Sequence, residues 1–151
     1  KQSVKSNHRK MGRVTRITLH HTGEHAGMRG LDDVEIVRRI ERYHRDGRKW
    51  SAIGYHYLIG RDGRVYEGRP ADIQGAHVSK ANGGNLGISC IGDFDKELPA
   101  RRQLGALQRF LDDQRRHYGV GSGRLYGHRD LGTTICPGDR LYAWLRRYKQ
   151  G

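Results

Sequence analysis

Residues 14–22, Val-Thr-Arg-Ile-Thr-Leu-His-His-Thr, decide the fold, because apolar Val14, Ile17 and Leu19 open a segment that alternates from Arg16 to His20 and ends in two adjacent histidines. Alternation with a period of two predicts a half-buried β-strand. His20 and His21 then stand at the end of this strand with their side chains on opposite faces. Sites for binding and catalysis often form in the loops beyond such strand ends. The segment therefore predicts both a strand of the central sheet and the edge at which a site would form.

Periodic patterns further along the chain predict three helices and four more strands. Apolar residues recur at helical spacing over residues 31–47, 104–118 and 141–148. The expected strands are residues 54–59, 65–67, 86–91 and 124–126, and Asp62-Gly63 supplies a hairpin turn between the first two of these. The resulting order is β-α-β-β-β-α-β-α, which is typical of a single α/β domain with a mixed central sheet flanked by helices.

The length of 151 residues predicts one domain. Residues 1–12 are polar, basic and free of acidic side chains, so we expect a flexible basic arm there and a folded domain over residues 13–151. No apolar run reaches the 18 residues of a membrane span. Two cysteines do not make a disulfide framework. The sequence begins at Lys1 rather than at a methionine, and it defines no cellular compartment.

The net charge of +13 predicts association with polyanions. Nucleic acid, acidic lipid and anionic wall polymers would all satisfy the charge. No helix-turn-helix, RNA-recognition or zinc-finger pattern is visible, so we expect no specific nucleic-acid partner. The basic residues concentrate in the first 16 residues and in the second and third predicted helices. A solvated, solubilising surface is the simpler explanation of these clusters, and recruitment to anionic envelope polymers or a lipid surface is the alternative.

Three metal-ligating residue types fall at predicted strand ends or in the loops that follow them. His20 and His21 end the first strand, His128 follows the strand near residue 125, and Cys136 comes eight residues later. Two imidazoles and one thiolate, with a fourth position open, suit catalytic zinc. By spacing alone an ordinary explanation stays open, in which the histidines are polar surface groups and the cysteine is a small buried apolar residue.

Short motifs around these residues occur in one order along nearly the whole chain. They are LHHT (19–22), GYHYLI (54–59), RDG (61–63), YEGR (66–69), GAH (75–77), NLGI (85–88), GHRD (127–130) and CPG (136–138). Together they resemble the N-acetylmuramoyl-L-alanine amidase type 2 family, which includes the peptidoglycan recognition proteins and the phage lysozyme-type amidases. The resemblance covers about residues 13–148 and implies a fold like that of a peptidoglycan recognition protein.

The resemblance implies a zinc ion held by His20, His128 and Cys136. It also implies hydrolysis of the amide between the lactyl group of N-acetylmuramic acid and L-alanine. Tyr55 and Thr134 are the candidates to orient water or to donate to the developing oxyanion. Thr134 resembles the recognition-protein branch of the family, which carries threonine at this position, whereas the phage enzymes usually carry lysine there.

Three further residues match positions near the family's substrate groove. We expect His77 to contact substrate and Asn85 to order the groove loop, with a plain turn-forming role for Asn85 as the alternative. Arg69 is a candidate partner for stem-peptide carboxylates, because a guanidinium group binds them with two hydrogen bonds, and a solvated surface charge is its alternative. No motif places a carboxylate as general base, although Glu24 is close in sequence to the first strand.

The sequence therefore predicts a monomeric zinc amidase that acts on peptidoglycan or muropeptides of a cell wall, whether it is secreted, periplasmic or delivered by a phage. The alternative is a recognition module that binds peptidoglycan without hydrolysis. In the family, non-catalytic relatives usually lack a zinc ligand, most often the cysteine. The presence of Cys136 therefore favours the enzyme.

Overall fold

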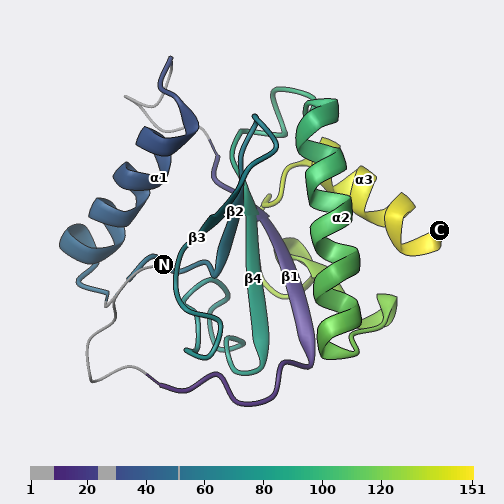
Figure 1. The fold of residues 1–151 in the computed structure, drawn as a ribbon, viewed down its shortest axis with the longest axis horizontal. Coiled ribbons are helices and arrows are strands. Elements are labelled where there is room, and N and C mark those ends of the chain that lie inside the picture. Colours follow the sequence, from purple (N-terminus) through teal and green to yellow (C-terminus); the bar gives the residue numbers. More distant parts are fainter. Residues whose placement is uncertain (1–8, 24–29, 51) are drawn as a thin grey trace.

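The structure is a computed structural model, and it describes residues 9–23, 30–50 and 52–151. Its centre is a five-stranded sheet in the order β3-β2-β4-β1-β5 (Figure 1). The strands are β1 (Arg16–His21), β2 (Tyr57–Ile59), β3 (Val65–Glu67), β4 (Asn85–Cys90) and β5 (Leu125–Gly127). All neighbouring strands are parallel except β2 and β3, which form an antiparallel hairpin. The predicted mixed sheet is confirmed.

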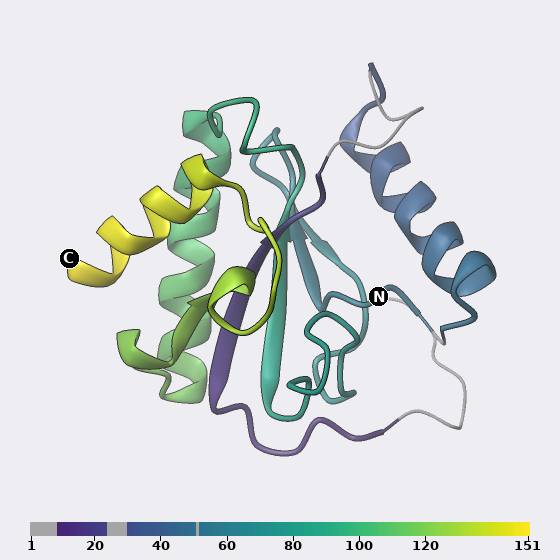
Figure 2. The ribbon, with the colours of Figure 1, turned by 180° about the vertical axis from the view of Figure 1, so that it is seen from behind.

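Helices cover both faces of this sheet. The long helices are α1 (Asp33–Arg42), α2 (Arg101–Tyr118) and α3 (Asp139–Gln150). Figures 1 and 2 show α1 on one side of the sheet and α2 with α3 on the other. A π-helical turn, Tyr43–Gly47, continues α1, and this accounts for the four-turn helix expected there. The order of strands and long helices is the predicted one, and no helix among the described residues is long and apolar enough to cross a membrane.

Local chemistry explains where several elements begin, turn and end. The side chain of Asp32 accepts a hydrogen bond from the backbone N–H of Glu35, which caps the first turn of α1. The helix α2 ends at Gly119, whose φ of 68° lies in the left-handed region that glycine adopts without strain. Gly63 does the same in the hairpin turn between β2 and β3, with φ at 84°.

Alternation along β1 separates the apolar core from the polar face of the sheet. Ile17 and Leu19 are fully buried in the larger core cluster, which also contains residues of α2 and α3. Thr18 and His20 are equally buried but point to the opposite face, on the side of α1. A smaller core cluster of α1 and β2 residues closes part of that face. His20 is therefore a buried polar residue on the side of the sheet that faces α1.

Most predicted boundaries shift by a few residues, and two of the differences change how the chain is organised. Residues 54–56 precede β2 as irregular chain, so the predicted strand over residues 54–59 keeps only its last three residues. The last residues of the predicted arm, 9–12, contact the folded domain. Met11 is buried in the core, and Lys10 pairs with Ile73 in an isolated antiparallel bridge. Residues 9–12 are therefore part of the fold, whereas residues 1–8 lie outside the described part of the chain.

Parallel pairing brings distant parts of the sequence together at one edge of the sheet. Leu19 of β1 pairs with Gly127 of β5, so the residues that follow them, His20 and His128, lie next to each other. On the other side of β1, His20 pairs with Ser89 of β4. The carboxyl ends of these three strands thus form a common edge, as expected for a site in an open α/β sheet.

Candidate metal centre and cleft

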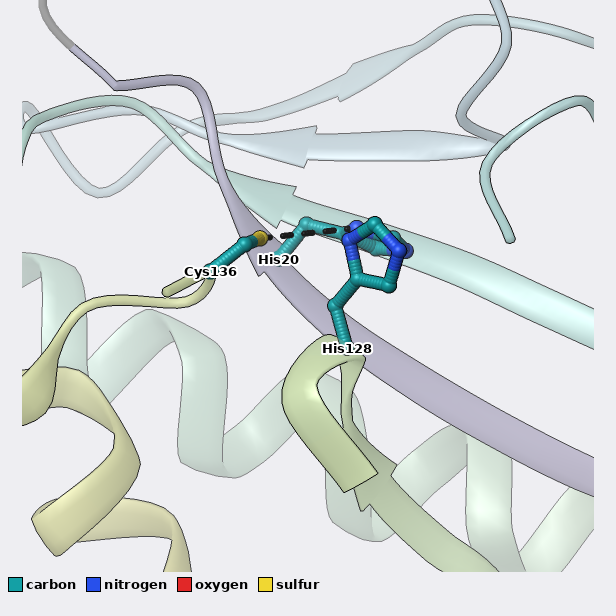
Figure 3. A group of neighbouring side chains, drawn as sticks. All are labelled: His20, His128 and Cys136. Carbon is teal, nitrogen blue, oxygen red and sulfur yellow. Dashed lines mark hydrogen bonds between the residues drawn. The ribbon is translucent and has the colours of Figure 1, made fainter. Parts of the chain in front are cut away.

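His20, His128 and Cys136 form a cluster at this edge of the sheet. Their ligand atoms all lie within 4.8 Å of one another, and Cys136 Sγ is 3.6 Å from His20 Nδ1. The rings of His20 and His128 have centroids 4.6 Å apart. Figure 3 shows the sulfur atom pointing toward His20 while the His128 ring approaches from the end of β5. The structure therefore brings together the three residues that the sequence predicts as zinc ligands.

The eight-residue spacing from His128 to Cys136 spans a loop that doubles back on itself. A single 3₁₀ turn, His128–Asp130, follows β5, and the backbone N–H of Arg129 donates to the carbonyl oxygen of Cys136 at 2.9 Å. The Arg129 guanidinium also pairs with Asp139 at 2.8 Å, at the start of α3. These contacts hold the two ends of the loop together, so both side chains face His20.

The donor set and its spacing fit zinc. A sulfur and a nitrogen ligand at about 2.3 and about 2.1 Å from zinc, spanning a tetrahedral angle, lie about 3.6 Å apart. The sulfur-to-nitrogen distance between Cys136 and His20 matches this value. Three protein ligands leave one coordination position open, which is the arrangement of catalytic rather than structural zinc sites.

The pKa shifts of the metal-free cluster also fit a metal site. Burial lowers the pKa of His20 well below its ordinary value, with further lowering from the neighbouring histidines, and burial also lowers the pKa of His128. Both rings are therefore neutral and able to act as ligands. Burial raises the pKa of the Cys136 thiol to about 12, although the N–H of His21 donates to the sulfur at 3.4 Å. A bound cation would be needed to favour the thiolate here.

His21 points away from this cluster. Its Nδ1 atom accepts the backbone N–H of Phe94 at 3.2 Å, and its ring faces that of Phe94. The two adjacent histidines therefore diverge as the strand geometry predicts, and His20 is the one directed to His128 and Cys136.

The cluster lies in a cleft with a volume of about 660 Å³, which Tyr55 and Thr134 also line. The Tyr55 ring has its centroid 5.1 Å from that of His20. Burial, together with the nearby Cys136, raises the pKa of the Tyr55 hydroxyl, so this group remains protonated and able to donate. Thr134 Oγ1 accepts the backbone N–H of Cys136 at 3.2 Å. Both residues thus lie where the sequence predicts them, beside the proposed ligands.

His77 and Asn85 lie behind the cluster. His77 Nδ1 is 2.9 Å from His20 Nε2, and His77 Nε2 is 2.8 Å from the carbonyl oxygen of Asn85. The Asn85 side chain accepts from the Thr18 hydroxyl at 2.7 Å and donates to the carbonyl of Ala81 at 2.9 Å. The Asn85 side chain therefore links β1 to the chain just before β4. His77 also lines the cleft, but its two ring nitrogens are directed to protein groups.

Arg69 does not line this cleft, and its predicted contact with stem-peptide carboxylates stays a prediction. Its guanidinium group donates to the carbonyl oxygens of Ile53, Gln74 and Ala52 at 2.8 to 3.1 Å. The side chain is buried, with 7% of its surface exposed, so it is not a solvated surface charge. Arg69 instead fastens the irregular segment before β2 to the loop that follows β3.

The opposite wall of the cleft contains residues that sequence reasoning did not select as a group. They come from α1, the π-helical turn and the chain just after it, and they are Arg39, Ile40, Tyr43, His44, Arg48 and Trp50. The Arg48 guanidinium lies over the rings of Trp50 and Tyr43, with centroid distances of 5.1 and 5.9 Å. The amphipathic pattern indicates which face of α1 is buried, but it does not show that the helix borders a cleft. No carboxylate lines the cleft among the described residues, and Glu24 lies outside them.

The model of one protein family, described as N-acetylmuramoyl-L-alanine amidase, matches residues 10–139. The chain belongs to this family. The match includes His20, His128 and Cys136 as well as Tyr55 and Thr134. It begins at Lys10, in agreement with the finding that residues 9–12 belong to the fold.

Relatives within this amidase family carry two kinds of name. Peptidoglycan-recognition protein SD of Drosophila simulans is 37% identical over 139 residues, which cover 89% of this chain and 73% of the relative. N-acetylmuramoyl-L-alanine amidase of Sus scrofa is 36% identical over 140 residues, covering 86% of this chain but 22% of that longer protein. Among solved structures, the ectodomain complex of peptidoglycan recognition proteins LCa and LCx with tracheal cytotoxin matches with a TM-score of 0.84 at 36% identity, covering 97% of this chain and 89% of that one.

Proposed function

We propose that this protein is a zinc-dependent amidase that hydrolyses the bond between the lactyl group of N-acetylmuramic acid and the L-alanine of peptidoglycan stem peptides. One observation carries the proposal: His20, His128 and Cys136 converge at the base of an open cleft with spacing that suits zinc. The N-acetylmuramoyl-L-alanine amidase family match supports the same reaction.

His20, His128 and Cys136 would hold the zinc ion. When bound, zinc supplies a Lewis acid that polarises a carbonyl group and makes water more acidic. The protonated Tyr55 hydroxyl is the donor available for the negative charge that develops on the amide oxygen. Thr134 holds the backbone of Cys136 through its hydroxyl oxygen and can in turn donate its proton into the cleft. Besides the zinc ion, the side chains that would stabilise the developing charge are therefore neutral hydroxyl groups.

The remote wall of the cleft suits a muropeptide. Arg39 and Arg48 place two guanidinium groups along it, and carboxylates of a stem peptide are their natural partners. Trp50 and Tyr43 add apolar ring surface against which a sugar or peptide can pack. The similar recognition-protein complex contains tracheal cytotoxin, and this supports peptidoglycan fragments as the ligand class here. Such a substrate places the site of action at a bacterial cell wall.

A recognition module that binds muropeptides without cleaving them is the second candidate. The relatives named as peptidoglycan recognition proteins favour it. The complete set of three zinc ligands, including Cys136, favours the enzyme instead. Both candidates share the same cleft and the same ligand class, so only a measurement of bond cleavage separates them.

The test is an incubation of the protein with purified peptidoglycan, followed by labelling of the new amino groups. The amidase releases L-alanine N-termini, loses this activity on treatment with a chelator and regains it on addition of zinc. Binding to peptidoglycan without new L-alanine N-termini, by protein that contains zinc, would establish the recognition module instead.

A further inference from the structure

Behind the proposed zinc ligands, a chain of buried hydrogen bonds leads away from the cleft. It runs from His20 Nε2 to His77 Nδ1 over 2.9 Å, and from His77 Nε2 to the Asn85 carbonyl oxygen over 2.8 Å. The exposed fractions of the three residues are 1%, 7% and 0%. Water therefore has little access to these bonds.

The carbonyl oxygen at the end of this series of hydrogen bonds determines which ring nitrogen carries each proton. A carbonyl oxygen can only accept, so His77 Nε2 must carry a proton and donate it to Asn85. The His77 ring is buried and neither hydrogen-bonding partner is an anion, so the ring is neutral and its Nδ1 is an acceptor. His20 Nε2 must then carry the proton in the first bond. His20 Nδ1 is left without a proton, and this is the atom that lies 3.6 Å from Cys136 Sγ.

The surroundings of His77 are built to hold its ring in one place. A Cβ atom added at Gly87 would lie 2.7 Å from the His77 ring, and one added at Gly75 would lie 2.6 Å from it. Both positions therefore need glycine for the ring to fit. The Asn82 side chain accepts the backbone N–H groups of His77 and Val78 at 2.9 and 2.8 Å, so the backbone at His77 is also held.

We propose that His77 is a positioning residue that fixes the tautomer and the ring orientation of His20, so that Nδ1 of His20 is the atom presented to zinc. This role rests on the proposed function only for the identity of the metal. It differs from the substrate contact that the GAH motif predicts for His77, because both ring nitrogens are used within the protein. Such outer partners of histidine ligands orient the ring and typically contribute 10–100-fold to metal affinity.

The first test needs neither zinc nor substrate. Long-range proton–nitrogen correlation NMR of the isotope-labelled, metal-free chain near neutral pH reports which nitrogen of each histidine carries the proton. We expect the Nε2–H form for both His20 and His77. Observation of the Nδ1–H form, or of a mixture of forms, at His20 would overturn the proposal even if the protein proves to be an active amidase.

The second test compares His77→Asn with His77→Leu, which have nearly the same shape. The asparagine retains a side-chain oxygen that can accept from His20, whereas the leucine does not. Zinc affinity, measured by competition with a chromophoric chelator, should fall 10–100-fold in His77→Leu and by clearly less in His77→Asn. Equal zinc affinity of the wild type and His77→Leu would contradict the role.

A matched control comes from His56, which is fully buried nearby with its ring centroid 5.7 Å from that of His77. Its nitrogens bond to the Ile73 carbonyl and the Gly87 N–H rather than to a proposed ligand. His56→Asn should lower the thermal stability while the folded fraction binds zinc like the wild type. A protein that binds zinc through the predicted tautomer but does not cleave peptidoglycan would refute the proposed amidase activity and leave the role of His77 intact.

Discussion

Cys136 Sγ and His20 Nδ1 lie 3.6 Å apart although 116 positions separate the two residues in the sequence. The thiol comes from the loop before α3, and the imidazole comes from the end of β1. Parallel pairing of β5 with β1 places the loop beside the histidine. The sheet topology thus assembles the proposed zinc site from residues that belong to separate short motifs of the sequence.

Removal of the Cys136 sulfur should remove the metal. We expect Cys136→Ala to lose bound zinc and activity, and Cys136→Ser to behave similarly because a neutral hydroxyl is a far poorer ligand than a thiolate. Cys90→Ala is the matched control, since Cys90 is buried in the core cluster on the other face of the sheet. Metal analysis by mass spectrometry should show zinc in this control. Full zinc occupancy in Cys136→Ala would refute the ligand assignment.

Loss of the Tyr55 hydroxyl should affect turnover without affecting metal content. Removal of one oxyanion donor typically costs about 10²–10³ in turnover, and we expect Tyr55→Phe to fall in that range. Tyr57→Phe is the control, because Tyr57 packs against Phe110 of α2 with ring centroids 4.8 Å apart. Rates on a defined muropeptide provide the measurement. A Tyr55→Phe variant that turns over like the Tyr57→Phe variant would exclude Tyr55 from the reaction.

Thr134→Val should destabilise the loop that contains Cys136 and should lower the turnover. The substitution keeps the shape but removes the acceptor of the Cys136 N–H, and a buried donor left without a partner costs about 1–3 kcal/mol. Thr134→Ser should retain most of the activity, because it keeps the hydroxyl. The exposed neighbour Thr133 offers a control in Thr133→Val. Similar turnover of the two valine variants would show that the Thr134 hydroxyl has no role.

Stability of the metal-free protein should decrease as the pH falls below about 6.5. Burial lowers the pKa of His56 to about 4 and that of His77 to about 3, so both stay neutral in the folded state while the unfolded chain takes up protons. Because the unfolded state binds more protons in this window, each histidine lowers the free energy of unfolding by up to about 1.4 kcal/mol per pH unit. Urea titrations with chelator present measure this slope. A flat free energy of unfolding between about pH 6.5 and about pH 5 would show that these rings are not held neutral.

The basic surface should act on wall binding and not on the chemistry. Exposed arginines of α2, among them Arg101, Arg109 and Arg116, lie on the opposite side of the sheet from α1 and its wall of the cleft (Figure 2). Attraction between exposed charges is screened over about 8 Å at physiological ionic strength. We expect wall binding to fall with added salt and with substitution of these arginines by glutamine, while turnover of a small muropeptide is unchanged. Wall binding that is insensitive to salt would leave the arginines as a solubilising surface only.

Much of the site could be predicted from the sequence because the relevant patterns are periodic or local. The alternation in β1 predicts that His20 and His21 diverge, and the strand near residue 125 predicts that His128 follows a strand end. The position of Arg69 could not be predicted in this way. Its partners are main-chain carbonyls of an irregular segment, and backbone acceptors leave no signature in side-chain order.

Two other features depend on contacts between segments that are far apart in the sequence. Met11 lies within a polar, basic run, and its burial results from pairing of the neighbouring backbone with residues 72–74. The role of His77 depends on the space left by Gly87 in β4 and on the direction of the His20 ring. Neither relationship follows from hydrophobic periodicity, because each is set by tertiary packing.

The measurement that tests the central claim most directly is product analysis of a chemically defined muropeptide after incubation with the zinc-loaded chain. If the chain is an amidase, we expect two products, the intact sugar with a free lactyl carboxylate and a peptide that begins with L-alanine. The sum of the two product masses should exceed the mass of the substrate by one water. Recovery of the muropeptide bound but uncleaved, from protein shown to contain one zinc per chain, would contradict hydrolysis and leave a recognition module.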